Sequence, residues 1–265
     1  DKSANSASDP ASEADAQPVS AELKGSIRKD LNAAADLMMD GKYSEAADLY
    51  RSILNKNSKE TNALAGLGMA LGRQFKLDAA DEQFELLLTI DPNNPVAHCG
   101  KAMVLLNRLQ SSNNTVIKSR TAILKEAGKE CNLALDADPR VVEAHYLLGR
   151  LLRELGVLGP AEQQLTAAVR DDDHLTSARR ELAGLLMLRG EFGKAHELYT
   201  ELLKEEKDNE LLIAAARAER LDGAPEKALT TLLNVHRQTG EIAGKSDEEL
   251  LGERARALLL VERGG

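Results

Sequence analysis

The sequence predicts an all-α solenoid of about six helix pairs followed by a C-terminal capping helix. Three observations predict this fold. Aromatic residues make up only 3% of the 265 residues, while Ala, Leu and Glu, which favour helix, are abundant. A short apolar pattern recurs along the chain at a nearly constant spacing. The seven prolines all lie outside the interiors of the expected helices, where a missing N–H would remove a hydrogen bond.

The recurring pattern is an Ala followed four residues later by a large apolar residue. It begins at Ala46, Ala80, Ala127, Ala161, Ala195 and Ala228. The spacings are 34, 47, 34, 34 and 33 residues, so the basic period is the length of one helix–turn–helix unit. Twelve residues before three of these alanines lies a second small residue, at Gly68, Gly149 and Ala183. Small residues at both sites let paired helices approach closely, and the large residue fills the space between them.

This recurrence resembles that of the tetratricopeptide repeat family over about residues 27–240. The best copies are 61–94, with Leu67-Gly68, Ala80, Phe84 and Pro92, and 176–209, with Leu182-Ala183, Ala195 and Tyr199. The family's first-helix Trp is absent, and its position holds Asp30, Leu64, His98, His145, Arg179 and Leu212. The resemblance implies a right-handed superhelix whose concave face is lined by the first helices and, in this family, binds peptides or partner helices.

Residues 21–265 therefore form one solenoid domain in this prediction. The six repeats fall at about 27–60, 61–94, 95–141, 142–175, 176–208 and 209–242. The third repeat carries 13 extra residues near 110–123, between its two helices. They form either a tolerated surface loop or a functional one, and the later ones could extend the following helix backwards. Ser246 and Glu249 form a capping box that opens a final helix over about 246–263.

Residues 1–20 contain mainly Ala, Ser, Asp and Pro, with Val19 as the only large apolar residue, and this composition predicts a disordered spacer. The first residue is Asp1 rather than Met, which fits a cleaved secretory signal or a chain trimmed at a domain edge. We favour the first reading and expect a periplasmic or secreted location, with the cytoplasm as the alternative. No stretch of about 18 or more apolar residues predicts a transmembrane segment.

Charge and motifs argue against several classes of function. The 34 basic and 43 acidic residues give a net charge of −9, whereas nucleic-acid binding needs clustered Lys and Arg. Gly66, Gly68 and Gly72 do not match a dinucleotide fingerprint, because the spacing is one residue too long and the segment lies inside an expected helix. The five histidines are dispersed, and no nucleophile elbow or phosphate loop is present. We therefore expect no enzyme activity, cofactor or metal.

The two cysteines, Cys99 and Cys131, are too few for a disulfide framework. We expect two free thiols that are partly buried. A disulfide between them would form only if the groove face and the helix seam meet.

The register of the repeats assigns candidate residues to the concave face. All five methionines fall at such positions, and methionine is common on surfaces that accept varied apolar partners, although ordinary helix packing would place it similarly. The C-terminal repeats place arginines there, which can grip carboxylates in two-point geometry or simply pair within a helix, as Arg150 could with Glu154. The candidate groove residues are Met38, Met69, Met103, Tyr146, Arg150, Arg153, Arg180, Met187, Arg217 and Arg220.

The sequence thus predicts a non-catalytic scaffold that binds another protein or peptide with Leu, Phe or Ile anchors and acidic flanks. An envelope or secreted assembly adaptor is the favoured setting. Two alternatives remain open. One is a regulatory or substrate-recognition domain of a larger enzyme such as a glycosyltransferase. The other is a structural protein that self-associates into a homo-oligomer through its repeat ends or its capping helix.

Overall fold

The computed structural model describes residues 21–111, 117–206, 208–239 and 245–264. These residues form thirteen α-helices and no strand, so the predicted all-α fold is confirmed for them. The helices are α1 (Ala21–Met39), α2 (Tyr43–Lys56), α3 (Thr61–Arg73), α4 (Leu77–Ile90), α5 (Pro95–Ser111), α6 (Ile117–Ala137), α7 (Val142–Glu154), α8 (Leu158–Asp171), α9 (Thr176–Arg189), α10 (Phe192–Glu205), α11 (Asn209–Leu221), α12 (Pro225–Thr239) and α13 (Lys245–Gly264). The segment 1–20, which the composition predicts to be disordered, lies outside the described residues, as do positions 112–116 of the insertion.

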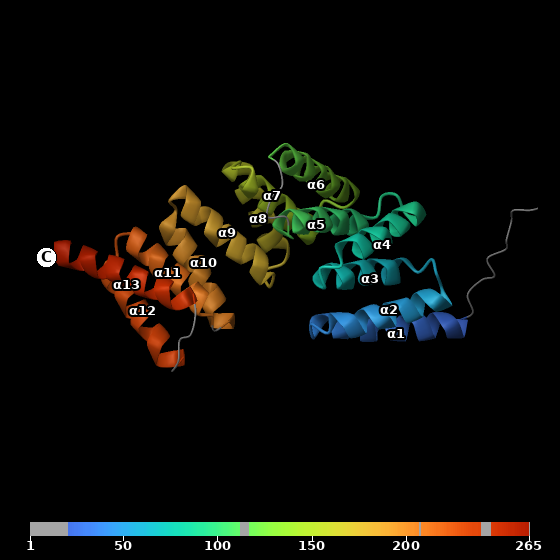
Figure 1. The fold of residues 1–265 in the computed structure, drawn as a ribbon, viewed down its shortest axis with the longest axis horizontal. Coiled ribbons are helices and arrows are strands. Elements are labelled where there is room, and N and C mark those ends of the chain that lie inside the picture. The colour runs from blue at the N-terminus through green and yellow to red at the C-terminus, as the bar shows by residue number, and fades with distance from the viewer. Residues whose placement is uncertain (1–20, 112–116, 207, 240–244, 265) are drawn as a thin grey trace, which may run out of the picture.

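The helices stack in sequence order into a curved solenoid (Figure 1). Each helix packs against the next one in the chain. In addition, the odd-numbered helices contact each other from repeat to repeat, as in α1 with α3, α3 with α5, α5 with α7 and α7 with α9. One face of the solenoid is therefore lined by the first helices of successive pairs, which is the face that the sequence assigned to binding.

The six periodic alanines lie at the seams between helices. Each of them has an exposed fraction of 0%, and the large residue one turn later is buried in every copy. Phe84 shows why the neighbouring sites are small. A Cβ added to Gly68 on α3 or to Gly100 on α5 would lie 2.6 or 2.2 Å from the Phe84 ring. The ring thus packs between the first helices of two successive repeats, and this arrangement confirms the packing role predicted for the small residues.

In several repeats a polar residue stands at the position of the missing tryptophan. Its side chain forms hydrogen bonds with a side chain of the second helix. Asp30 accepts a hydrogen bond from Lys56 at 2.7 Å, and Arg179 donates two to Glu205 at 3.0 and 2.6 Å. Both pairs span 26 residues, with the charges reversed. The histidines at the same position make equivalent hydrogen bonds to a second-helix side chain and to a proline carbonyl: His98 with Glu130 and Pro92, and His145 with Gln164 and Pro139.

The turn between the two helices of a pair has the same backbone geometry in five repeats. Its central residue has a positive φ, between 57° and 88°, at Gly41, Phe75, Gly156, Gly190 and Gly223. Glycine adopts this left-handed conformation freely, whereas other residues lose about 1–2 kcal/mol in it. Phe75 is therefore in a strained conformation, and among the described residues it is the only non-glycine with a positive φ.

The insertion of the third repeat lengthens its second helix. The α6 helix begins at Ile117 and has 21 residues, so the expected backward extension of this helix is confirmed. The capping helix expected at 246–263 corresponds to α13. Within the described part of the chain, no helix combines the length and the apolar character needed to cross a membrane.

Candidate peptide-binding groove

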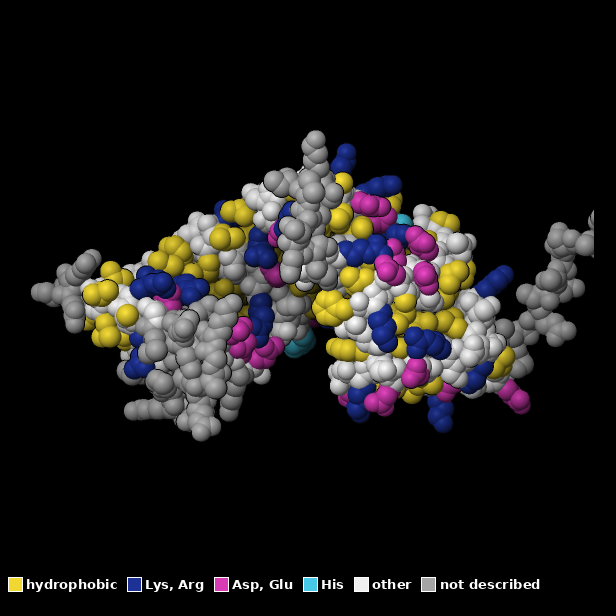
Figure 2. Space-filling model, viewed as in Figure 1, with side chains coloured by type: hydrophobic (Ala, Val, Ile, Leu, Met, Phe, Trp, Pro, Cys, Tyr) yellow, Lys and Arg dark blue, Asp and Glu magenta, His cyan; other side chains and the backbone are white. Residues whose placement is uncertain are grey.

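A cavity of about 420 Å³ opens on the face lined by the first helices. Residues from five successive repeats line it: Tyr43, Met69, Gly72, Arg73, Phe75, Cys99, Met103, Asn107, Glu143, Tyr146, Leu147, Arg150, Leu175 and Ser177. We call this cavity the groove. Figure 2 shows a hollow between the N-terminal and C-terminal repeats, with hydrophobic side chains gathered along its N-terminal side. The solenoid thus brings together residues that are far apart in the sequence.

Two methionines form part of the groove lining. Met69 on α3 and Met103 on α5 are half-buried, and both also pack against the N-terminal core. Glycine at position 72 makes room for Met103, because a Cβ there would lie 2.5 Å from the Met103 methyl carbon. Met38 and Met187 are also half-buried, but they pack against the cores without lining the groove. All four methionines therefore pack against a core, and Met69 and Met103 line the groove as well.

Arg150 on α7 stands at the C-terminal side of the groove. Its guanidinium lies 5.5 Å from the centroid of the Tyr146 ring, a cation–π contact that holds both side chains in place. Its Nε lies 3.6 Å from a carboxylate oxygen of Glu181 on α9, while Arg153 is 3.0 Å from the other oxygen. The charge on this side of the groove is thus partly balanced by the next repeat.

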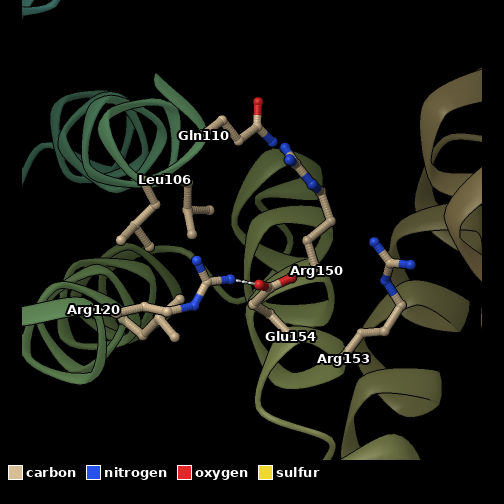
Figure 3. A pocket seen from close by; sticks show the side chains of 8 residues that line it. Leu106, Gln110, Arg120, Arg150, Arg153 and Glu154 are labelled. Carbon is tan, nitrogen blue, oxygen red and sulfur yellow. Dashed lines mark ion pairs between the residues drawn. The ribbon is translucent and has the colours of Figure 1, made fainter. Parts of the chain in front are cut away.

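The intrahelical pair between Arg150 and Glu154 that the sequence allows is not formed. Glu154 instead pairs with Arg120 of α6, because the lengthened α6 reaches the end of α7 (Figure 3). These two residues border a second cavity of about 190 Å³ that Arg150 also lines. Leu106, Leu109 and Leu124 complete its apolar part. Arg150 is therefore the side chain that separates the groove from this smaller cavity.

The remaining arginines of the candidate set are engaged with acidic groups of the next element. Arg180 pairs with Glu206 and, at 2.8 Å, with Asp208. Arg217 and Arg220 pair with Glu253 of α13 at 2.9 and 3.0 Å. None of these three arginines lines the groove. Of the ten candidates, the groove gathers Met69, Met103, Tyr146 and Arg150.

Several groove residues are absent from the candidate set predicted from the sequence, and three of them have large side chains near the ends of the first helices. Tyr43 begins a second helix and Phe75 lies in a turn, so a register based on first-helix positions does not reach them. Arg73 is the last residue of the first helix α3, within reach of the register, but it is not among the candidate residues. Arg73 is exposed and forms no ion pair with any described residue. The groove lining holds two arginines, Arg73 and Arg150, against a single carboxylate, Glu143. Its local charge is positive although the chain as a whole carries −9.

The two cysteines are free and buried, as expected from the sequence. Burial raises the pKa of the Cys131 thiol to about 12 and also raises the pKa of Cys99. Both groups are therefore protonated thiols near neutral pH and poor nucleophiles. The described residues contain no cluster of three or more His, Cys, Asp or Glu side chains placed to hold a metal ion.

We expect both thiols of the native protein to react slowly with a thiol-specific chromogenic reagent at pH 8. The rate should be at least about a hundredfold below that of free cysteine, because thiolate is scarce and access is blocked. The control is the same protein in guanidinium, which should release two equivalents at once. Rapid labelling of one native thiol would show that its environment is open.

No protein-family model matches the chain. A probable UDP-N-acetylglucosamine–peptide N-acetylglucosaminyltransferase, SPINDLY of Solanum lycopersicum, is 30% identical over 113 residues, which are 42% of this chain and 10% of that protein. The chain spans only 7% to 12% of the length of the curated relatives that it matches.

Solved structures match over most of the chain. TTC0263, a tetratricopeptide repeat protein of Thermus thermophilus, has a TM-score of 0.64 at 22% identity and covers 72% of this chain and 98% of its own. PilW, a type IV pilus biogenesis factor, has a TM-score of 0.67 at 20% identity and covers 85% of this chain and 98% of its own. At these identities the likeness concerns the fold.

Proposed function

We propose that this chain, which has the tetratricopeptide repeat fold, is a non-catalytic scaffold that binds a peptide or partner helix in the groove. The observation that carries the proposal is the groove itself. It is a mostly apolar cavity of about 420 Å³ that five repeats line, with two polarisable methionines and three aromatic rings at its surface. Such a cavity offers an adaptable contact for large apolar side chains.

The charge of the groove supports a partner with acidic residues beside its apolar anchors. Arg73 and Arg150 flank the apolar part, and arginine binds carboxylates in two-point geometry. The arginines further along the solenoid pair more closely with acidic groups of this chain, at 2.8 to 3.0 Å, whereas Arg150 lies 3.6 Å from Glu181. The acidic flanks of the partner would therefore contact the groove rather than the last repeats of the solenoid.

For the biological setting we propose an envelope or secreted assembly adaptor. The likeness of fold to PilW, a pilus biogenesis factor, supports this setting. A second candidate is a recognition domain within a larger enzyme, which the match to a small part of a glycosyltransferase supports. The mass of the native protein separates them, because the second candidate requires a product much longer than 265 residues.

Arg150→Glu should weaken the capture of acidic peptides by about tenfold or more, because it replaces an attractive charge with a repulsive one at the groove. The measurement is a selection from a random 12-residue peptide library on the unaltered protein, followed by anisotropy titration of the enriched peptides. The matched control is Arg170→Glu on α8 of the same repeat, whose side chain is exposed and outside the groove lining. Equal affinities for both variants, with helicity retained, would refute the groove assignment.

A further inference from the structure

Phe75 occupies a position that glycine holds in the other described turns of this kind. It follows Gly41 by 34 residues and precedes Gly156 by 81, which is two periods plus the insertion of 13. Gly190 and Gly223 continue the series at spacings of 34 and 33. One turn in this series therefore carries a bulky aromatic ring where the others carry no side chain at all.

The strain at Phe75 comes from a turn geometry that the fold imposes. The Phe75 N–H donates to the Gly72 carbonyl at 3.1 Å. The next N–H, of Lys76, donates to the Leu71 carbonyl at 3.0 Å. The same pair of hydrogen bonds, each 2.9 Å long, closes the turn at Gly156. Phe75 thus adopts the conformation that this helix ending requires, although a β-carbon disfavours it.

The Phe75 ring adds little to the stability of the fold, so it does not offset the backbone strain. The Phe75 side chain is 65% exposed, so it contributes little to the core. A Cβ at Gly41, Gly156 or Gly223 would meet nothing within 4 Å, so these turns are formed without any contact from a side chain at this position. Glycine at position 75 would satisfy the fold equally well. A residue that is both strained and exposed points to a role outside folding.

The ring lies where a ligand would meet it. Phe75 borders the groove together with Met69 and Met103, and the unpaired Arg73 lines the same cavity two residues earlier in the chain. We propose that Phe75 is the specificity-determining contact of the groove. It holds a Phe or Leu side chain of a bound peptide against Met103, while Arg73 binds an Asp or Glu beside that anchor. This inference rests on the function proposed above and names the motif that the groove selects.

The complementarity of charge supports this occupant over a basic or neutral segment. Arg73 and Arg150 are the cations of the lining, and Arg73 has no carboxylate among the described residues to neutralise it. An acidic residue beside the anchor would supply that carboxylate. An apolar anchor would also bury the exposed Phe75 ring, and burial of aromatic area is a main source of binding energy at such contacts.

The test uses peptides enriched from a random 12-residue library on the unaltered protein, titrated against three variants by anisotropy. We expect Phe75→Gly to bind about tenfold more weakly and yet to melt at a higher temperature, because the turn is relieved of strain. Phe75→Tyr should keep the affinity within about twofold, since the ring remains. Arg73→Ala should lose affinity only for peptides with an acidic residue beside the anchor.

The outcomes separate this inference from the proposed function. If Phe75→Gly binds as well as the unaltered protein while Arg150→Glu does not, the groove binds peptides but Phe75 does not select them. If Phe75→Gly lowers the melting temperature, the ring serves the fold and the inference is wrong. If the unaltered protein enriches no peptide, both the function and the inference are wrong.

Discussion

Ala80→Arg should unfold the second repeat. Ala80 lies on α4 with no exposed surface, in the same buried face as Phe84 and Leu87. An arginine there would need the neighbouring helix to move away, and its charge would lose its water without gaining a partner. We expect a loss of more than about 4 kcal/mol in the free energy of unfolding, which only buried sites show. Urea unfolding followed by circular dichroism measures it.

The matched control for this variant is Leu86→Arg on the same helix. Leu86 is 51% exposed, so the same new side chain can extend into water, and its effect should stay within about 0.5 kcal/mol. Because each repeat packs only against its neighbours, loss of the second repeat should also uncouple the first pair of helices from the rest. An unchanged unfolding midpoint for Ala80→Arg would mean that the seam is not where the structure places it.

The fold could be predicted from the sequence because the residues that determine it act locally and recur in every repeat. A small residue at a seam, such as Ala80 or Gly68, is required by the close approach of two helices, and the same requirement recurs once in every repeat. The period therefore shows directly in the sequence. The register also identified the groove residues on the middle of the first helices, namely Met69, Met103 and Tyr146.

The ion pairs that the arginines form could not be predicted from the repeat pattern. The register allows Arg150 to meet Glu154 one turn away, but the long α6 supplies Arg120, which takes that carboxylate. The choice depends on the length and placement of an inserted segment, and no periodic pattern records these. Similarly, Arg217 finds Glu253 at a separation of 36 residues because α13 stacks on α11.

The turn at Phe75 could have been found from the sequence, because Phe75 stands at the spacing of the turn glycines. The residue type hid this, because phenylalanine is not expected at a position with a positive φ. Gly41, Gly156, Gly190 and Gly223 mark the turn at the spacing of the repeats, and Phe75 falls into their series. A phenylalanine between two helices is easily taken for a core residue. Only the combination of a positive φ with a largely exposed ring shows that this phenylalanine serves neither the turn nor the core.

Glu253→Ala should release the capping helix from the end of the solenoid. Glu253 is only 1% exposed and accepts hydrogen bonds from Arg217 and Arg220 of α11. Its removal leaves the mostly buried Arg220 without its carboxylate, whereas the Arg217 side chain is 40% exposed and can be solvated, so we expect a cost of about 1–3 kcal/mol. Hydrogen exchange followed by mass spectrometry should show faster exchange in α13. Arg256→Ala is the control, because Arg256 also pairs with Glu253 but is mostly exposed and should contribute less than about 1 kcal/mol.

The same carboxylate should make the attachment of α13 sensitive to acid. Burial alone would raise the pKa of Glu253, but the hydrogen bonds from Arg217 and Arg220 outweigh burial and hold it below the ordinary value of 4.5. A carboxyl whose pKa is lowered by folding stabilises the native state above that ordinary value and loses this contribution as the pH falls through its folded pKa. After normalisation to the intrinsic exchange rate at each pH, the protection of the α13 amides should therefore fall below a pH of about 4 in the unaltered protein. In Glu253→Gln the α13 amides should already be weakly protected at neutral pH, with little further loss of protection in acid. An equally strong acid response in Glu253→Gln would show that other carboxylates, and not Glu253, hold the cap in place.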